Sequence, residues 1–75
     1  MNEQIAEAIR SRIPDARVDV AVEGNGARIT VVSREFEGMS RVKKQQAVYA
    51  CIDGLIADGT LHAVTIRALT PDEAR

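Results

Sequence analysis

The only histidine of this chain, His62, lies in a strand-like run of residues 61–71 near the C-terminus. An imidazole can ligate a metal or transfer a proton near neutral pH, but one imidazole completes neither kind of site alone. The chain also holds a single cysteine, Cys51, so it cannot form an internal disulfide or supply the four ligands of a closed zinc site. Chemistry at His62 therefore requires groups from outside the chain.

Alternation along the strand expected over residues 61–69 gives His62 a plain structural interpretation. Successive residues of a strand point to opposite faces, so His62 would share its face with apolar residues. These residues are Val64, Ile66 and Ala68. A lone histidine in such surroundings is commonly a core or edge residue with one hydrogen bond, and the pattern by itself does not identify a ligand.

Cys51 stands beside Ile52 in the middle of an apolar helical pattern. A buried free cysteine behaves as a small apolar residue, whereas ligating thiolates need an exposed, electropositive setting. We therefore expect Cys51 to be structural.

The start of the longest expected helix carries a basic cluster. Its members are Arg41, Lys43 and Lys44, with Arg34 upstream. Basic side chains supply most nonspecific affinity for nucleic acid, so one interpretation is a phosphate-contacting patch. Two nearby glutamates, the lack of interleaved aromatic residues and the lack of a Gly-x-x-Gly clamp weigh against it. Because cations oppose the dipole at a helix N-terminus, a surface for an acidic protein partner stays open beside the simplest interpretation, a solvated face.

Motifs for catalysis are lacking. Glu35 and Glu37 are two residues apart in a connecting segment, but carboxylates without a cleft or a perturbing environment make no acid–base site. Ser33 and Ser40 have no evident base, and the glycines around Asn25 are too few for a phosphate-binding loop. We expect a protein that is not an enzyme.

The N-terminal half predicts a helix followed by a β-hairpin. Apolar residues at spacings of three and four predict a helix over about residues 2–12, which Pro14 ends. They are Ile5, Ala8, Ile9 and Ile13. Alternating valines at 18, 20 and 22 predict a half-buried strand, and the strand pattern resumes at residues 29–32. Because Gly24-Asn25-Gly26 tolerates positive φ, the two strands should form an antiparallel hairpin.

The C-terminal half predicts a connection, a long helix and a last strand. Residues 33–38 are polar apart from Phe36, and Ser40 is a suitable N-cap for a helix ending near Ala57. The apolar positions of this helix, with one glutamine among them, are Val42, Gln45, Val48, Tyr49, Ile52, Leu55 and Ile56. The last strand should run from about residue 61 to 69, and residues 70–73 suggest a turn with a helix start.

This order of elements predicts an α+β fold for residues 1–75 as one domain. Helix, strand, strand, helix, strand makes a two-layer sandwich with both helices on one face of a three-stranded sheet. The second helix supplies the long crossover that parallel pairing of the last strand requires. The order resembles a type II KH-like fold, which says little about function.

Composition sets further limits. Hydrophobic residues make up 45% of the chain, but with one Phe, one Tyr and no Trp the core must be built from Ile, Val, Leu and Ala. A net charge of -1 provides no global attraction to nucleic acid or to an anionic membrane. No apolar run approaches a membrane span, and the N-terminus has no basic region followed by an apolar one, so we expect a cytoplasmic protein.

Two long motifs carry a resemblance to a known family. Residues 36–49, Phe-Glu-Gly-Met-Ser-Arg-Val-Lys-Lys-Gln-Gln-Ala-Val-Tyr, and residues 61–71, Leu-His-Ala-Val-Thr-Ile-Arg-Ala-Leu-Thr-Pro, closely resemble the BolA family. The similarity is closest to its small acid-stress-associated branch, in which the run Gly-Met-Ser-Arg-Val-Lys-Lys-Gln-Gln is typical. About half of the chain is covered at the level of motifs.

The resemblance implies a partnership. BolA-like proteins pair with monothiol glutaredoxins that carry a Cys-Gly-Phe-Ser site, and the heterodimer can share a [2Fe–2S] cluster ligated partly by the histidine of a His-Ala motif. That histidine corresponds to His62. A cluster needs four ligands, so this chain could hold one only together with its partner and none when isolated. Many family members have a second His or Cys in the loop between the first two strands, but residues 23–27, Glu-Gly-Asn-Gly-Ala, contain neither.

Two functional hypotheses follow. The first is an adaptor that binds a monothiol glutaredoxin in iron–sulfur cluster assembly, trafficking or iron homeostasis, with His62 as cluster ligand. The alternative is a DNA-binding transcriptional regulator of a stress response that uses Arg41, Lys43 and Lys44. We expect no membrane partner, and a monomer or weak homodimer when the chain is alone. A module that makes protein contacts through a free sheet edge also stays open.

Overall fold

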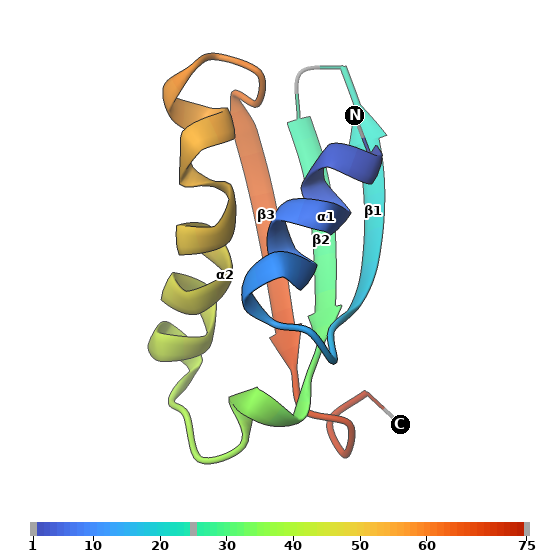
Figure 1. Ribbon diagram of the computed structural model, residues 1–75, viewed down its shortest axis with the longest axis vertical. Helices are drawn as coiled ribbons and strands as arrows, with labels where there is room; N and C mark the ends of the chain where they lie inside the picture. The colour runs from blue at the N-terminus through green and yellow to red at the C-terminus, as the bar shows by residue number, and fades with distance from the viewer. Residues whose placement is uncertain (1, 25, 75) are drawn as a thin grey trace.

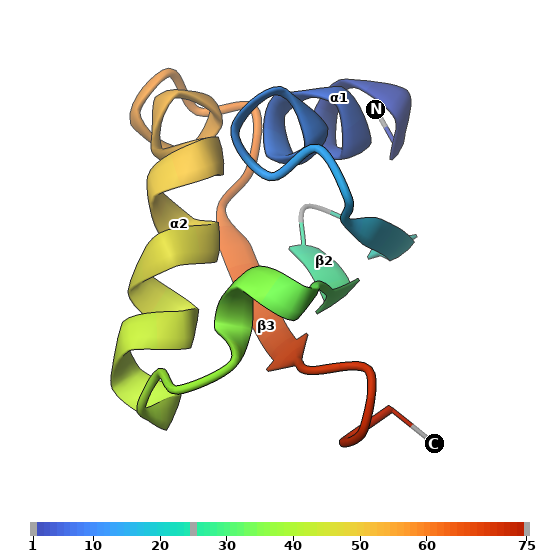
Figure 2. The same ribbon diagram turned by 60° about the horizontal axis from the view of Figure 1, so that its bottom comes forward.

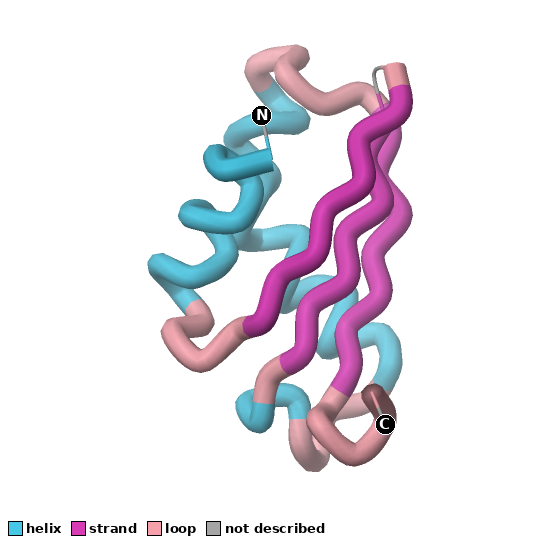
Figure 3. Tube along the Cα trace, turned by 90° about the vertical axis from the view of Figure 1, so that its right-hand side faces the viewer, coloured by secondary structure: helices cyan, strands magenta, loops and turns pink. Residues whose placement is uncertain are grey.

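The order of elements matches the expected one. The computed structural model describes residues 2–24 and 26–74. The elements are α1 (Asn2–Arg12), β1 (Arg17–Glu23), β2 (Gly26–Val32), a short 3-10 helix η1 (Arg34–Phe36), α2 (Arg41–Ala57) and β3 (Ala63–Leu69). The three strands form one sheet, and both helices lie on the same face of it (Figures 1 and 3). The predicted α+β two-layer architecture is therefore confirmed.

The hairpin forms where the glycines allow a tight turn. β1 and β2 pair antiparallel from Arg17↔Val32 to Glu23↔Gly26, which leaves a loop of only two residues. Gly24 has a φ of +58°, a left-handed conformation that costs glycine nothing. The tight turn sets the register that places alternate valines of β1 toward the helices.

β3 joins the sheet beside β2 and parallel to it, in the strand order β1-β2-β3. The crossover from β2 to β3 consists of η1 and α2, and α2 lies over the β3 side of the sheet (Figure 2). This confirms the parallel pairing predicted from the long helical connection. It also leaves β1 and β3 as the two edge strands.

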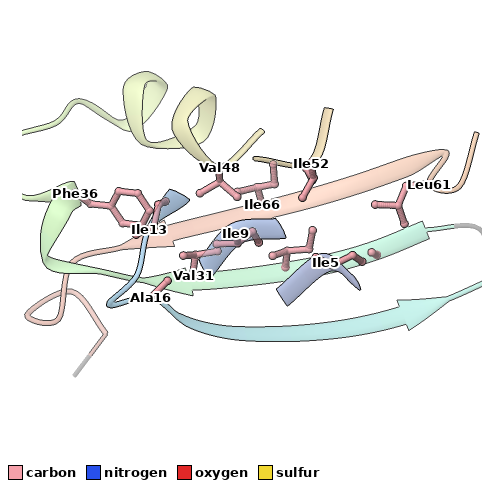
Figure 4. Close-up of a cluster of buried hydrophobic side chains, with 12 residues drawn as sticks. Ile5, Ile9, Ile13, Ala16, Val31, Phe36, Val48, Ile52, Leu61 and Ile66 are labelled. Atoms are coloured by element: carbon pink, nitrogen blue, oxygen red, sulfur yellow. The ribbon is translucent and has the colours of Figure 1, made fainter. Parts of the chain in front are cut away.

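The core lies between the helices and the sheet (Figure 4). α1 contributes Ile5 and Ile9, both completely buried, and α2 contributes Val48 and Ile52. The other buried apolar side chains are Ile13, Ala16, Ala27, Ile29, Val31, Phe36, Leu61 and Ile66. As expected from the composition, aliphatic residues build the core and Phe36 is its one aromatic member.

α2 begins and ends as predicted, but fewer of its residues are buried than the apolar spacing predicted. Ser40 caps it by accepting a hydrogen bond from the Lys43 amide at 3.2 Å. Val42 is 64% exposed and Tyr49 is 44% exposed, so these two residues do not join the core. In the described part of the chain β3 is an edge strand, so the sheet does not extend under the outer side of α2.

β3 starts two residues later than predicted, at Ala63 rather than residue 61. Its alternation is as expected within these bounds, because Ile66 is buried while Thr65 and Arg67 are exposed. Residues 61 and 62 belong to the loop from α2, where a bend replaces strand geometry. The alternation therefore does not extend to His62.

The segment after β3 forms the turn that its sequence suggested. The Thr70 amide donates to the Glu73 carboxylate at 2.8 Å, and the Glu73 amide donates to the Thr70 hydroxyl at 3.2 Å. This reciprocal pair is the capping box of a helix start. Among residues 2–24 and 26–74, no helix is long and apolar enough to cross a membrane.

Candidate functional site

The loop that carries His62 has a fixed backbone. The Thr60 amide donates to the Asp58 carboxylate at 2.9 Å, and hydrogen bonding from Thr60 holds the pKa of Asp58 below its usual value. Gly59 turns the chain with a φ of +85°. The Leu61 amide then donates to the Leu55 carbonyl at 3.0 Å, which ties the end of the loop to α2.

Leu61 and His62 point in opposite directions. Leu61 is 1% exposed and packs into the core between α2 and the sheet (Figure 4), whereas His62 is exposed. The expected placement of His62 on the apolar face of Val64 and Ile66 is therefore wrong, because the bend before β3 turns Leu61 inward instead. Among the residues that the structure describes, no hydrogen bond involves the His62 ring. An anchored backbone thus presents a free imidazole to solvent.

The β1–β2 turn lies at the same end of the sheet as the start of β3 (Figure 1), which His62 directly precedes. Ala63, the residue after His62, pairs with Gly26 at the start of β2. The approach is close, since a Cβ on Gly26 would meet the Ala63 carbonyl oxygen at 3.3 Å. The turn in which the resemblance led us to look for a second ligand thus borders the residue after His62, although Asn25 lies outside the described residues.

That neighbouring turn offers few side chains that could ligate a metal. Glu23 carries its only carboxylate, and this group pairs with Arg28 at 3.8 Å with both side chains largely exposed. Within the described part of the chain, no group of three or more His, Cys, Asp or Glu side chains could hold a metal ion. The donor set fits a metal or cluster only if this chain supplies one imidazole and other molecules supply the remaining ligands.

Cys51 is half-buried in α2, and its thiol donates to the Ala47 carbonyl at 3.3 Å. Burial raises its pKa, which disfavours the thiolate form that ligates metals and attacks electrophiles. Both observations agree with the structural role expected from the sequence.

Lys44, a member of the basic cluster, is engaged within the chain. Its ammonium lies 2.7 Å from the Glu73 carboxylate, and only 12% of its side chain is exposed. The hydrogen bond from Lys44, with a second one from the Thr70 amide, lowers the pKa of Glu73 to about 2. Lys44 therefore ties the start of α2 to the turn after β3 and presents little charge to solvent.

Of the other basic residues in this cluster, Arg41 lies near Lys44, but Lys43 and Arg34 do not. Arg41 shares a groove with Lys44 and Arg67, whereas Lys43 does not line it, because successive helix residues point about 100° apart. Arg34 lies near Asp15 instead, with its Nε 3.8 Å from the carboxylate. The structure thus divides the cluster expected from the sequence over more than one surface.

Sequence reasoning missed a polar cluster between the α1–β1 connection and η1. Ser33 is only 1% exposed, and its hydroxyl donates to Asp15 at 2.6 Å and accepts from the Glu35 amide at 3.0 Å. Asp15 also accepts from the Arg34 amide at 3.0 Å, and these bonds, led by the one from Ser33, lower its pKa. Since these partners are 18 and 19 residues apart, no local spacing signals the cluster. These hydrogen bonds hold the α1–β1 connection against the start of η1, which is a structural role.

Comparison with known proteins gives a consistent result. The family model described as BolA-like protein matches residues 10–73. An uncharacterised protein from the rpoN-murA intergenic region of Acinetobacter guillouiae is 43% identical over 74 residues, covering 99% of this chain and 89% of that protein. Acid stress protein IbaG of Escherichia coli is 40% identical over 72 residues, covering 96% and 86%.

A solved structure agrees with this result. BolA1 from Arabidopsis thaliana superposes with a TM-score of 0.85 at 25% identity, and the match covers 99% of this chain and 95% of that one.

Proposed function

The chain belongs to the BolA-like protein family, and from this membership we propose that it is a non-catalytic adaptor for a monothiol glutaredoxin in iron–sulfur cluster handling. In this role His62 supplies one ligand to a [2Fe–2S] cluster shared with the partner. The observation that carries the proposal is the exposed imidazole of His62 on an anchored loop.

The ligand count supports a shared site over a site within this chain. A [2Fe–2S] cluster takes four ligands, usually thiolates and sometimes imidazoles. Here the one cysteine is half-buried and bonded to a helix carbonyl, and the one histidine is exposed at the surface. This chain can therefore contribute a single ligand, and the partner and its thiols must contribute the others.

The loop around His62 explains how one ligand can be positioned well. Leu61 is buried on one side, and on the other side Ala63 pairs with Gly26 in the sheet. Little backbone entropy remains to be lost when the imidazole binds, which favours binding by a preorganised group. Because only one bond would hold a cluster to this chain, release would leave the fold intact, as a carrier requires.

Reconstitution with a monothiol glutaredoxin tests the proposal. The chain is mixed with such a glutaredoxin, iron, sulfide and glutathione, and the visible absorption and circular dichroism spectra are compared with those of the glutaredoxin alone. We expect a heterodimer whose spectrum differs from that of the glutaredoxin homodimer.

Variants at one position separate ligation from complex formation. His62→Ala should remove the spectral difference, and His62→Cys, which restores a soft ligand, should give a third and distinct spectrum. Thr65→Ala, a change at an exposed residue of β3, serves as the matched control and should behave as the wild type. Spectra of His62→Ala identical to the wild type would remove His62 from the ligand set. The lack of any complex between the wild-type chain and the glutaredoxin would refute the proposed partnership.

We do not propose DNA contact by the start of α2 as the main function. Lys44 is paired with Glu73 at 2.7 Å, and the basic cluster is divided over several surfaces, so few free cations remain for phosphate. A DNA-binding role would require affinity that falls with salt, with a log–log slope smaller by roughly 1 when one contacting lysine is neutralised. Lys43→Gln measured by fluorescence anisotropy would reveal such a contribution.

A further inference from the structure

The two edge strands differ in whether a side chain hydrogen-bonds to their backbone. At the β3 edge the Gln45 side chain of α2 donates to the Ile66 carbonyl at 2.8 Å, which occupies a main-chain acceptor. At the β1 edge, within the described residues, no side chain bonds to the strand backbone, and no other element lies in front of it (Figure 3). An open edge of seven residues is a template for another strand.

The hairpin register determines which backbone groups of β1 are free. A two-residue loop makes Glu23 and Gly26, which flank it, a hydrogen-bonded pair. In an antiparallel ladder the bonded residues alternate, so the odd-numbered residues of β1 bond to β2. The amides and carbonyls of Val18, Val20 and Val22 consequently point to the open edge.

The sequence of β1, Arg-Val-Asp-Val-Ala-Val-Glu, is complementary to itself when two copies run antiparallel. With Val20 on a two-fold axis, Arg17 of each copy lies opposite Glu23 of the other, and Val18 lies opposite Val22. The outward backbone groups of the valines then face each other as hydrogen-bonded pairs. Arg17 and Glu23 form the closer, non-bonded pairs, in which opposite charges stabilise most.

The charged residues of α1 beside this edge are also complementary to those of a second copy. A groove between α1 and β1 is lined by Glu3, Glu7 and Arg10 from the helix. A two-fold axis through Val20 runs α1 antiparallel to its copy, so the acidic half of each helix approaches Arg10 of the other. Val22, 36% exposed in the single chain, would also be covered.

We propose that two copies of this chain associate through their β1 edges into a continuous six-stranded sheet, centred on Val20 and with Arg17 paired to Glu23 of the second copy. This goes beyond the proposed function and is independent of it. His62 directly precedes β3, which forms the opposite edge of the sheet from β1 (Figure 1), so the dimer leaves it accessible. Each dimer would carry two imidazoles for two partners.

The interface is small, since it joins one strand and part of one helix from each copy. Interfaces below about 1,200 Å² are typical of weak, transient association. The dimer should therefore be reversible, populated at high protein concentration and favoured at low salt, because its charge pairs are at the surface.

Sedimentation equilibrium of the intact chain over a range of concentrations tests the pairing. Arg17→Glu and Glu23→Arg should each weaken dimerisation by about tenfold, because each replaces two attractive pairs by repulsive ones. The double variant Arg17→Glu/Glu23→Arg restores opposite charges across the interface and should recover most of the wild-type affinity, although it replaces the exposed Glu23–Arg28 pair within each copy by two like charges. Arg67→Glu makes the same change of charge on β3 and is the matched control, with affinity expected to be unchanged.

Amide hydrogen exchange followed by NMR tests the register. Exchange of the Val18, Val20 and Val22 amides should slow with rising concentration, while that of Asp19 and Ala21, already bonded to β2, should not change. A chain that stays monomeric, or a dimer indifferent to Arg17→Glu, would overturn the proposal. So would a monomer whose Val18, Val20 and Val22 amides are protected only by an added glutaredoxin, because the edge would then serve a partner strand.

Discussion

Replacing Leu61 with alanine tests whether Leu61, and not His62, completes the core at the end of α2. Strand alternation from the sequence placed His62 on the apolar face, whereas the structure buries Leu61 and exposes His62. The two arrangements predict opposite results for the two alanine variants.

The magnitude follows from the burial of Leu61, which is 1% exposed. Leucine to alanine removes three carbon atoms, worth about 2.4 kcal/mol in transfer free energy, and the cavity left behind raises the loss to about 3 kcal/mol. For a chain of 75 residues the whole free energy of unfolding is only about 4 to 11 kcal/mol. The melting temperature should fall by roughly 12 to 24 °C. His62→Ala should change the free energy of unfolding by no more than about 0.5 kcal/mol.

Urea unfolding followed by circular dichroism, together with thermal melts, measures both variants against the wild type. The conservative change Leu61→Val removes less volume and should give a smaller loss, which keeps the test usable if Leu61→Ala does not fold. A loss below about 1 kcal/mol for Leu61→Ala, or a larger loss for His62→Ala than for Leu61→Ala, would refute the arrangement.

Two further predictions concern the polar contacts that join distant segments. The pKa of Glu73, about 2 against an ordinary 4.5, means that its ionised form stabilises the fold fully above about pH 4.5, and that this stability is lost as the pH falls toward 2. The gap in unfolding free energy between wild type and Glu73→Gln should therefore close over that range in pH-dependent melts, and a constant gap would contradict the pairing with Lys44. Ser33→Ala should lower the free energy of unfolding because Asp15 loses the hydrogen bond from the Ser33 hydroxyl, and NMR titration should show the pKa of Asp15 moving up, since that bond is the largest cause of its lowered value; an unchanged pKa would rule out the contact.

Local patterns predicted the elements well. The stripe Ile5, Ile9 and Ile13 identified the buried face of α1, and the glycines at 24 and 26 identified the hairpin. The Ser40 cap and the end of α2 at Ala57 were also as expected. These features depend on neighbours within a few residues, which is the range over which spacing carries information.

The sequence by itself determined that this protein has one imidazole and one thiol, an α+β order of elements, and motifs of the BolA family. From ligand count alone it follows that any cluster must be shared. Only the tertiary structure decided that Leu61 turns inward and His62 outward, since the bend that reverses them depends on the packing of α2 against the sheet. The same holds for the ion pair of Lys44 with Glu73, 29 residues apart. From the sequence we expected the Lys44 ammonium to be available to a binding partner, but in the fold it binds Glu73. Both outcomes depend on which segments meet in space, and spacing along the chain does not encode that.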